Sequence, residues 1–162
     1  NKVDKIIKSL PFELTLDQIK CINTIDFLVN EVGLPIEPMF VRGAVALKCY
    51  DLAEFLLDEL AKPFNLALIT GDKGLINRLK SNSNVPSSLL NKIISRINND
   101  IGMQKVKYSL IGDLAIICAN NKSKALANKL ISNLSDTKRD MVLDYVDEES
   151  DTALSVLGWS NE

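Results

Sequence analysis

Short apolar segments with helical spacing, separated by turn residues, recur along this chain from residue 40 onward. Each segment is long enough for only two or three helical turns, and a helix that short is stable only when its apolar face packs against a neighbour. The pattern therefore predicts an all-α fold of stacked antiparallel helix pairs. The predicted pairs are 41–48 with 51–61, 66–70 with 73–79, and 112–119 with 123–131.

A longer helix, 87–98, is predicted between the second and third pairs. Its apolar residues recur at helical intervals, and Ser87 or Ser88 after Pro86 is expected to cap its first turn. Residues 105–111 alternate polar and apolar side chains, a pattern that is also typical of a strand. The sequence leaves both helix and strand open in that segment.

The first 36 residues are expected to form a separate helical segment. Thr15 followed by Gln18 has the spacing of a capping box, and apolar residues then recur at helical intervals up to Gly33. We expect this segment to cap the exposed apolar side of the first pair, because an end repeat otherwise leaves its core face in water. The predicted domains are therefore 1–36 and 37–162.

The charge balance limits the kinds of partner. Charged residues make up 25% of the chain and nearly cancel to a formal net charge of -2. This near-cancellation provides no broadly basic surface for nucleic acid or for an acidic membrane. No apolar run approaches the roughly 18 residues that can cross a bilayer. The predictions are no nucleic acid, no membrane, a cytoplasmic location and a monomer.

Histidine is absent from the sequence. Its absence excludes, within this stretch, Ser-His-Asp and Cys-His catalysis and the common histidine-ligated metal sites. No Cys-x-x-Cys motif occurs either, and we predict neither a metal nor a cofactor. The cysteines lie far apart among apolar neighbours, which is typical of buried free thiols. A reactive or metal-bound thiol is the alternative for Cys21, Cys49 or Cys118.

Two short motifs admit both a functional and a structural interpretation. Thr70-Gly-Asp-Lys-Gly74 has glycines and a lysine near a helix start, as a phosphate loop does. It lacks the Gly-Lys-Thr or Gly-Lys-Ser arrangement, which favours a connecting turn. The carboxylates between residues 144 and 151 lack the spacing of a calcium loop, which favours a solvated acidic hairpin. The tip of such a hairpin prefers a basic partner.

The most specific pattern is the stretch 142–154, an acidic, hairpin-like segment that runs into Thr152-Ala153-Leu154 at the expected start of a helix. It resembles the opening of an ankyrin repeat. In that family the threonine hydroxyl locks the first turn of the helix, while the alanine and leucine pack between neighbouring repeats. The earlier pairs resemble divergent ankyrin repeats, with small residues on a first helix and aliphatic residues on a second, such as Ala44 and Val45 with Leu56 and Leu57.

The resemblance covers roughly residues 40–162. The spacing between pairs is uneven, and only the last unit carries the hairpin and Thr-Ala-Leu. A different α-solenoid, an irregular helical domain and a mixed α/β fold are the alternatives. Within the ankyrin interpretation, residues 152–159 form a first helix whose partner helix would follow Glu162. The chain is therefore expected to be part of a longer protein.

The resemblance implies a non-catalytic module that binds another protein through a concave face made by first helices and hairpin tips. The alternative is an enzyme, or the regulatory domain of one, whose catalytic part lies outside this stretch. Lysine and asparagine are abundant, which we interpret as the product of an AT-rich coding sequence. Together with the ankyrin-like units, this composition makes an effector secreted into the cytoplasm of a host cell one candidate, beside a part of a larger protein. The residues expected at the partner-binding face are Arg42, Lys48, Thr70, Asn120, Tyr145, Asp147, Glu148 and Trp159.

Overall fold

The computed structural model describes residue 23 and residues 36–145. Within these residues the regular structure is entirely helical, with eight α-helices, a 3-10 helix and no strand, which confirms the all-α prediction. The chain divides into two compact units, Asn1–Pro63 and Phe64–Glu162. The predicted boundary between residues 36 and 37 stays a prediction, and the predicted N-terminal cap lies outside the described residues.

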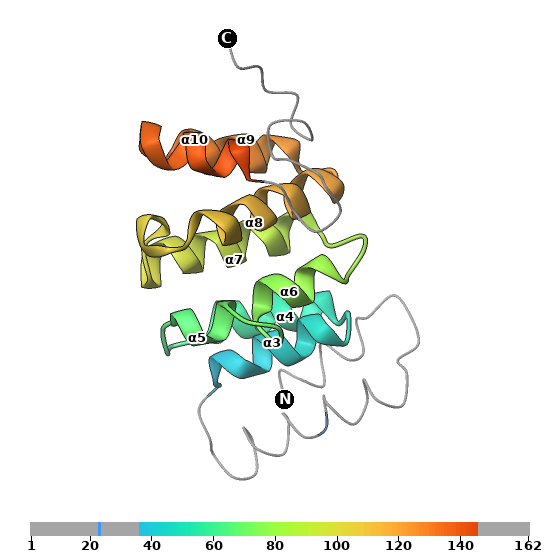
Figure 1. Cartoon of the computed structure of the whole chain (residues 1–162). Helices are drawn as coiled ribbons and strands as arrows, with labels where there is room; N and C mark the ends of the chain where they lie inside the picture. Colours follow the sequence, from blue (N-terminus) through green and yellow to red (C-terminus); the bar gives the residue numbers. More distant parts are fainter. Residues whose placement is uncertain (1–22, 24–35, 146–162) are drawn as a thin grey trace. The chain divides into compact units, whose positions relative to one another are not determined.

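The first unit contributes a pair of helices, α3 (Pro38–Ala46) and α4 (Tyr50–Glu59), which contact each other (Figure 1). Pro38 opens α3, where its missing N–H is not needed by the helix. The chain then reverses in a short turn in which Lys48 has a φ of 59°. Both predicted helices of this pair are therefore present, and each buries an apolar face made of Val41, Ala44 and Val45 on α3 and Leu52, Ala53, Leu56 and Leu57 on α4.

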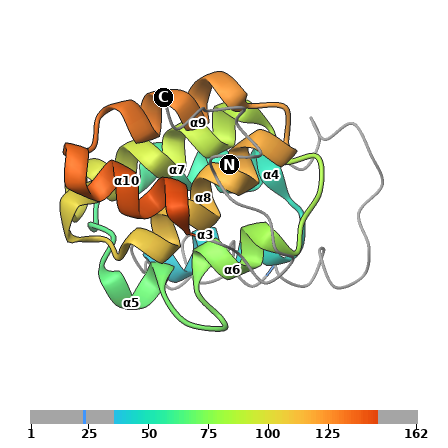
Figure 2. The same cartoon turned by 45° about the horizontal axis from the view of Figure 1, so that its top comes forward.

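The second unit is organised around one central helix. Its elements are α5 (Leu66–Ile69), α6 (Leu75–Lys80), α7 (Ser87–Asp100), the 3-10 helix η2 (Met103–Lys105), α8 (Tyr108–Asn120), α9 (Lys124–Ser132) and α10 (Asp136–Asp144). Helix α8 contacts α6, α9 and α10, as the two views in Figures 1 and 2 show. Residues 111–119 are all buried, so α8 is covered on every side. None of the described helices combines the length and the apolar character that a bilayer crossing requires.

The structure decides between the two alternatives for one segment and departs from the prediction in another. The alternation over 105–111 does not form a strand, because η2 ends at Lys105 and α8 begins at Tyr108, four residues before its predicted start. The expected hairpin-like stretch 142–154 also differs in the part that the structure describes, because helix α10 runs from Asp136 to Asp144. Its first turn is capped by Ser135, whose Oγ accepts a hydrogen bond of 3.3 Å from the N–H of Lys138. This cap starts a helix even though the segment has little apolar periodicity.

The start of α7 also differs in detail. Pro86 is its N-cap residue, and neither predicted serine caps the helix through its side chain. Instead, the hydroxyl of Ser87 shares a hydrogen bond of 2.5 Å with that of Ser123, which lies just before α9. Ser87 therefore connects α7 to the turn between α8 and α9.

The turn at 70–74 is confirmed as a connection between helices α5 and α6. Gly71 has a φ of 82°, a conformation that glycine adopts without strain. The amide of Asn77 donates a hydrogen bond of 3.0 Å to the carbonyl of Gly71, which folds the turn back against α6. This turn forms one end of the groove described next.

Candidate functional site

A polar groove runs beside α6 and α8 within the second unit. Its volume is about 510 Å³. Amide, hydroxyl and charged side chains line most of it, together with a few aliphatic ones. We call it the α6–α8 groove, and its lining residues are Asp72, Asn77, Leu79, Lys80, Ser81, Asn82, Asp113, Ile116, Ile117, Asn120 and Asn121.

The groove contains a buried carboxylate. Asp113 lies in the middle of α8 and is only 6% exposed. Nζ of Lys80, the last residue of α6, lies 3.3 Å from its Oδ2. The hydroxyl of Tyr145, which follows α10, donates a hydrogen bond of 2.9 Å to its Oδ1. A buried carboxylate is tolerated when it is both paired and hydrogen-bonded, and Asp113 meets both conditions.

Because Lys80 and Tyr145 both engage Asp113, this carboxylate acts as a structural acceptor that joins three helices. The chemistry that the groove offers to a ligand therefore comes mainly from its amide and hydroxyl groups, which both donate and accept hydrogen bonds. Leu79, Ile116 and Ile117 add an apolar lining.

Asn121 fixes the wall of the groove. Its Oδ1 accepts a hydrogen bond of 2.8 Å from the N–H of Val85, and its Nδ2 donates one of 2.8 Å to the carbonyl of Ile117. One side chain thus holds the loop before α7 against the end of α8. The neighbouring Asn120, the last residue of α8, is exposed at the groove.

The structure brings two of the predicted partner-binding residues to this region. Asn120 lines the groove, and Tyr145 contacts Asp113 inside it. Thr70 lies at the end of α5, where its hydroxyl donates a hydrogen bond of 2.8 Å to the carbonyl of Leu66 and so terminates that helix.

The other predicted residues lie elsewhere. Arg42, on α3, is half-buried, and Lys48 is exposed in the turn before α4, so both belong to the first unit. Asp147, Glu148 and Trp159 lie outside the described residues.

Asp113 and Lys80 were not among the predicted site residues. A single carboxylate inside an otherwise apolar helical segment is the sequence signal that could have identified Asp113, because aspartate is almost never buried without a partner. The partner of Asp113 is Lys80, which lies 33 positions earlier in the chain, and nothing in the sequence around Lys80 indicates this pairing.

Both cysteines in the described part of the chain are buried, and neither forms a disulfide. Burial raises the pKa of the Cys118 thiol to about 12, so this thiol is protonated near neutral pH. Cys21 lies outside the described residues. Among residue 23 and residues 36–145, no three or more cysteine, aspartate or glutamate side chains gather where they could hold a metal ion.

Comparison of the chain with protein-family models, with curated proteins and with solved structures found no match.

Proposed function

We propose that this chain is a non-catalytic protein-binding module built of ankyrin-like helix pairs, and that the α6–α8 groove is a main part of its binding surface. The observation that supports this most is the composition of the groove, in which amide side chains surround a short aliphatic lining. The exposed amide of Asn120, at the end of a central helix, would contact the partner directly.

Such a lining suits a peptide segment. A peptide backbone presents one donor and one acceptor per residue, and an asparagine amide can satisfy both. The aliphatic residues Leu79, Ile116 and Ile117 would accept an apolar side chain of the partner. The groove volume of about 510 Å³ is within the range of known ligand pockets.

The buried Asp113 would give the groove a fixed shape before the partner arrives. Its two contacts join α6 and α10 to α8, and a surface held in its binding shape loses less conformational entropy on association. A protein partner, a monomeric state, a cytoplasmic location and secretion as an effector all belong to this proposal.

Photo-crosslinking tests the proposed face. A photoreactive residue placed at Asn120 should form a discrete adduct with a protein in cells that express the chain, and excess unlabelled wild-type chain should suppress the adduct. The N120R variant should suppress it much less, because a long cation replaces the amide at the groove. The matched control places the same photoreactive residue at Ser132, an exposed position at the end of α9. Adducts from position 132 with none from position 120 would mean that the partner binds near the end of α9 and not at the α6–α8 groove.

A further inference from the structure

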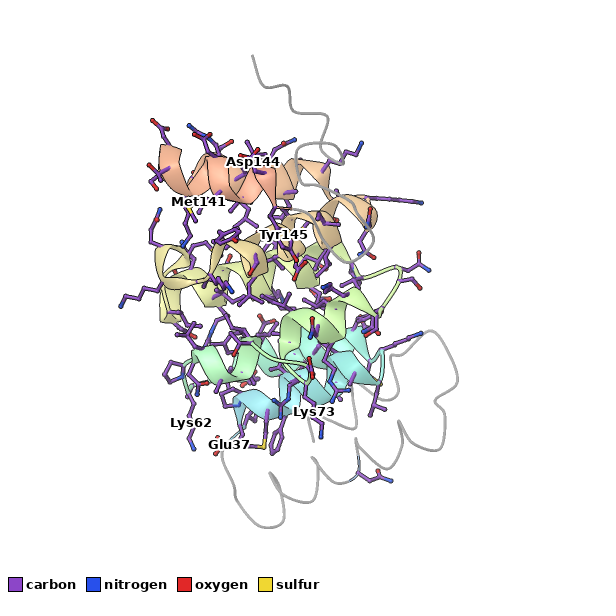
Figure 3. The ribbon with its side chains drawn as sticks, viewed as in Figure 1. Glu37, Lys62, Lys73, Met141, Asp144 and Tyr145 are labelled. Atoms are coloured by element: carbon purple, nitrogen blue, oxygen red, sulfur yellow. The ribbon has the colours of Figure 1, made fainter. Side chains whose placement is uncertain are left out.

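A second, smaller pocket lies where the start of α8 meets the end of α10. Its volume is about 370 Å³, and it is lined by Tyr108, Met141, Asp144 and Tyr145. Figure 3 shows Met141 and Tyr145 between α10 and α8. We call it the tyrosine pocket. Met141 is 43% exposed and Asp144 is also exposed, so solvent reaches this site.

The two tyrosine rings stand nearly perpendicular. Their centroids are 6.3 Å apart and the angle between their planes is 80°. Each ring face carries partial negative charge, and a cation within about 6 Å of a ring centroid is attracted to it. Two perpendicular rings at this separation form a corner in which one cation can lie within that distance of both. The packing thus provides two walls of a cation site.

One carboxylate, that of Asp144, lines the pocket. Asp144 is the last residue of α10, and no basic residue occupies the last turn of that helix. The C-terminal end of a helix carries partial negative charge, so a carboxylate there is unfavourable for the isolated helix and a nearby cation is favourable. Asp144 forms no ion pair with any of the residues that the structure describes. A bound cation would pair with this carboxylate.

The lining also selects the type of cation. An unmodified ammonium group needs several hydrogen-bond acceptors to replace its water, whereas the pocket offers two aromatic rings, a thioether and one carboxylate. The hydroxyl of Tyr145 is already engaged with Asp113. A methylated ammonium keeps its charge but has few or no N–H groups to satisfy, and its methyl groups contact ring faces and the methionine sulfur favourably.

The geometry points to the tyrosine pocket as a binding site for a methylated ammonium group, carried by a methylated lysine side chain of the protein partner. The identification of a protein as the source of this group rests on the proposed function. The cation site itself rests on the four lining residues.

Choline and its uncharged isostere 3,3-dimethylbutan-1-ol test the cation site in the full chain. Choline should shift the aromatic NMR signals of Tyr108 and Tyr145 with a Kd on the order of 1 mM, and the isostere, which has the same shape without the charge, should shift them much less. Equal shifts from both compounds, or none from either, would overturn the proposal.

Matched variants locate the charge that matters. Asp144→Asn should weaken choline binding about five-fold, the size expected for one exposed charge at contact distance. Asp140→Asn removes the same charge from an exposed position one turn earlier on α10, outside the pocket lining, and should change the Kd less than two-fold. Equal effects of the two variants would indicate general charge attraction and would refute the site.

Two further variants separate the ring faces from the fold. Tyr108→Leu removes one wall and should weaken choline binding about two- to five-fold. Tyr50→Leu makes the same change in the first unit, outside the pocket lining, and should bind choline like the wild type. Retained choline binding in Tyr108→Leu, checked for folding by its NMR spectrum, would contradict the role of that ring.

A short peptide that contains trimethyllysine, compared with the same peptide containing unmodified lysine, tests the source of the cation. Tighter binding of the methylated peptide than of both the unmodified peptide and choline supports a partner side chain as the ligand. Equal binding of the two peptides, or tighter binding of choline, refutes that part of the proposal. The two proposals fail in different ways. Choline binding without any crosslinked partner contradicts the protein-binding function, whereas a partner adduct at position 120 without choline binding contradicts only the tyrosine pocket.

Discussion

The hydroxyl of Tyr145 donates a hydrogen bond of 2.9 Å to Oδ1 of Asp113 and so joins the end of α10 to the middle of α8. Asp113 is 6% exposed and also pairs with Lys80. A carboxylate at that depth depends on its partners, because desolvation without them is costly. This one contact also connects the two sites, since Asp113 lines the α6–α8 groove and Tyr145 lines the tyrosine pocket.

Removal of the Tyr145 hydroxyl should therefore destabilise the second unit. Tyr145→Phe leaves one oxygen of a buried carboxylate without its donor, and we expect a loss of about 1–3 kcal/mol in the free energy of unfolding. Urea unfolding followed by circular dichroism measures this change. Tyr108→Phe is the matched control, because the Tyr108 hydroxyl forms no hydrogen bond with the described residues. A change within about 0.5 kcal/mol is expected there.

Gly112 is required by the ring of Tyr145. A Cβ at this position would overlap that ring, whose Cγ would lie 3.1 Å away. Gly112→Ala should therefore displace the ring, break its hydrogen bond to Asp113 and lower the free energy of unfolding by about 1–3 kcal/mol. Gly43, inside α3, is the contrasting case, because among the described residues no atom beyond the backbone of its own helix and its chain neighbours lies within 4 Å of a Cβ built there.

Gly43→Ala should stabilise the chain by about 0.5–1 kcal/mol, since alanine is the better helix former and meets no obstacle. Thermal or urea unfolding of the two alanine variants side by side checks the opposite signs. Destabilisation of similar size in both would mean that the Tyr145 ring is not the cause at Gly112.

Helix α7 shows how far the sequence predicts the fold. Its apolar residues lie on one side of a well-separated amphipathic helix, and the predicted range of 87–98 compares with Ser87–Asp100 in the structure. The start of α8 was less predictable because residues 111–119 are buried on all sides, so the helix has no polar face to mark its period. Among residues 136–144 only Val142 is buried, so an apolar pattern for this helix is absent.

The candidate site was predictable only in part. Asn120 and Tyr145 were expected at a binding face from the ankyrin resemblance, and both lie at or next to the α6–α8 groove. The partners of Asp113 come from positions 33 residues before it and 32 residues after it. Local periodicity describes contacts three or four residues apart, so it carries no information on which distant side chains meet at Asp113.

The buried thiol of Cys118 should make stability depend on alkaline pH. Burial raises its pKa from 9.0 to about 12, so between these values the unfolded chain loses the thiol proton while the folded chain keeps it. The contribution of Cys118 is therefore fully present below pH 9 and is lost as pH rises from 9 towards 12, with a slope of about 1.4 kcal/mol per pH unit.

Other groups also titrate in this range, so the measurement is a difference. The free energy of unfolding should fall less steeply with pH above 9 in Cys118→Ala than in the wild type. The same thiol should also resist alkylation by iodoacetamide at pH 8 until the chain is unfolded. Rapid modification of Cys118 in the folded chain would contradict the burial on which this prediction rests.

Two adjacent asparagines at the end of α8 should separate stability from binding. The side chain of Asn121 accepts a hydrogen bond from the N–H of Val85 and donates one to the carbonyl of Ile117, and each bond is 2.8 Å long. Val85 is 2% exposed, so water does not readily replace the lost acceptor. Asn121→Ala should therefore lower the free energy of unfolding by about 1–3 kcal/mol.

Asn120→Ala removes the same amide one position earlier, where the side chain is exposed. Its free energy of unfolding should change by no more than about 0.5 kcal/mol, because no buried group loses a partner. If the proposed function is correct, this variant should compete poorly against the wild type for the partner that crosslinks at the groove. Asn121→Ala, assayed below its unfolding temperature, should compete better than Asn120→Ala. If Asn120→Ala competed as well as the wild type, the amide of Asn120 would not be part of the binding surface. The structural role of Asn121 would be unaffected by that result.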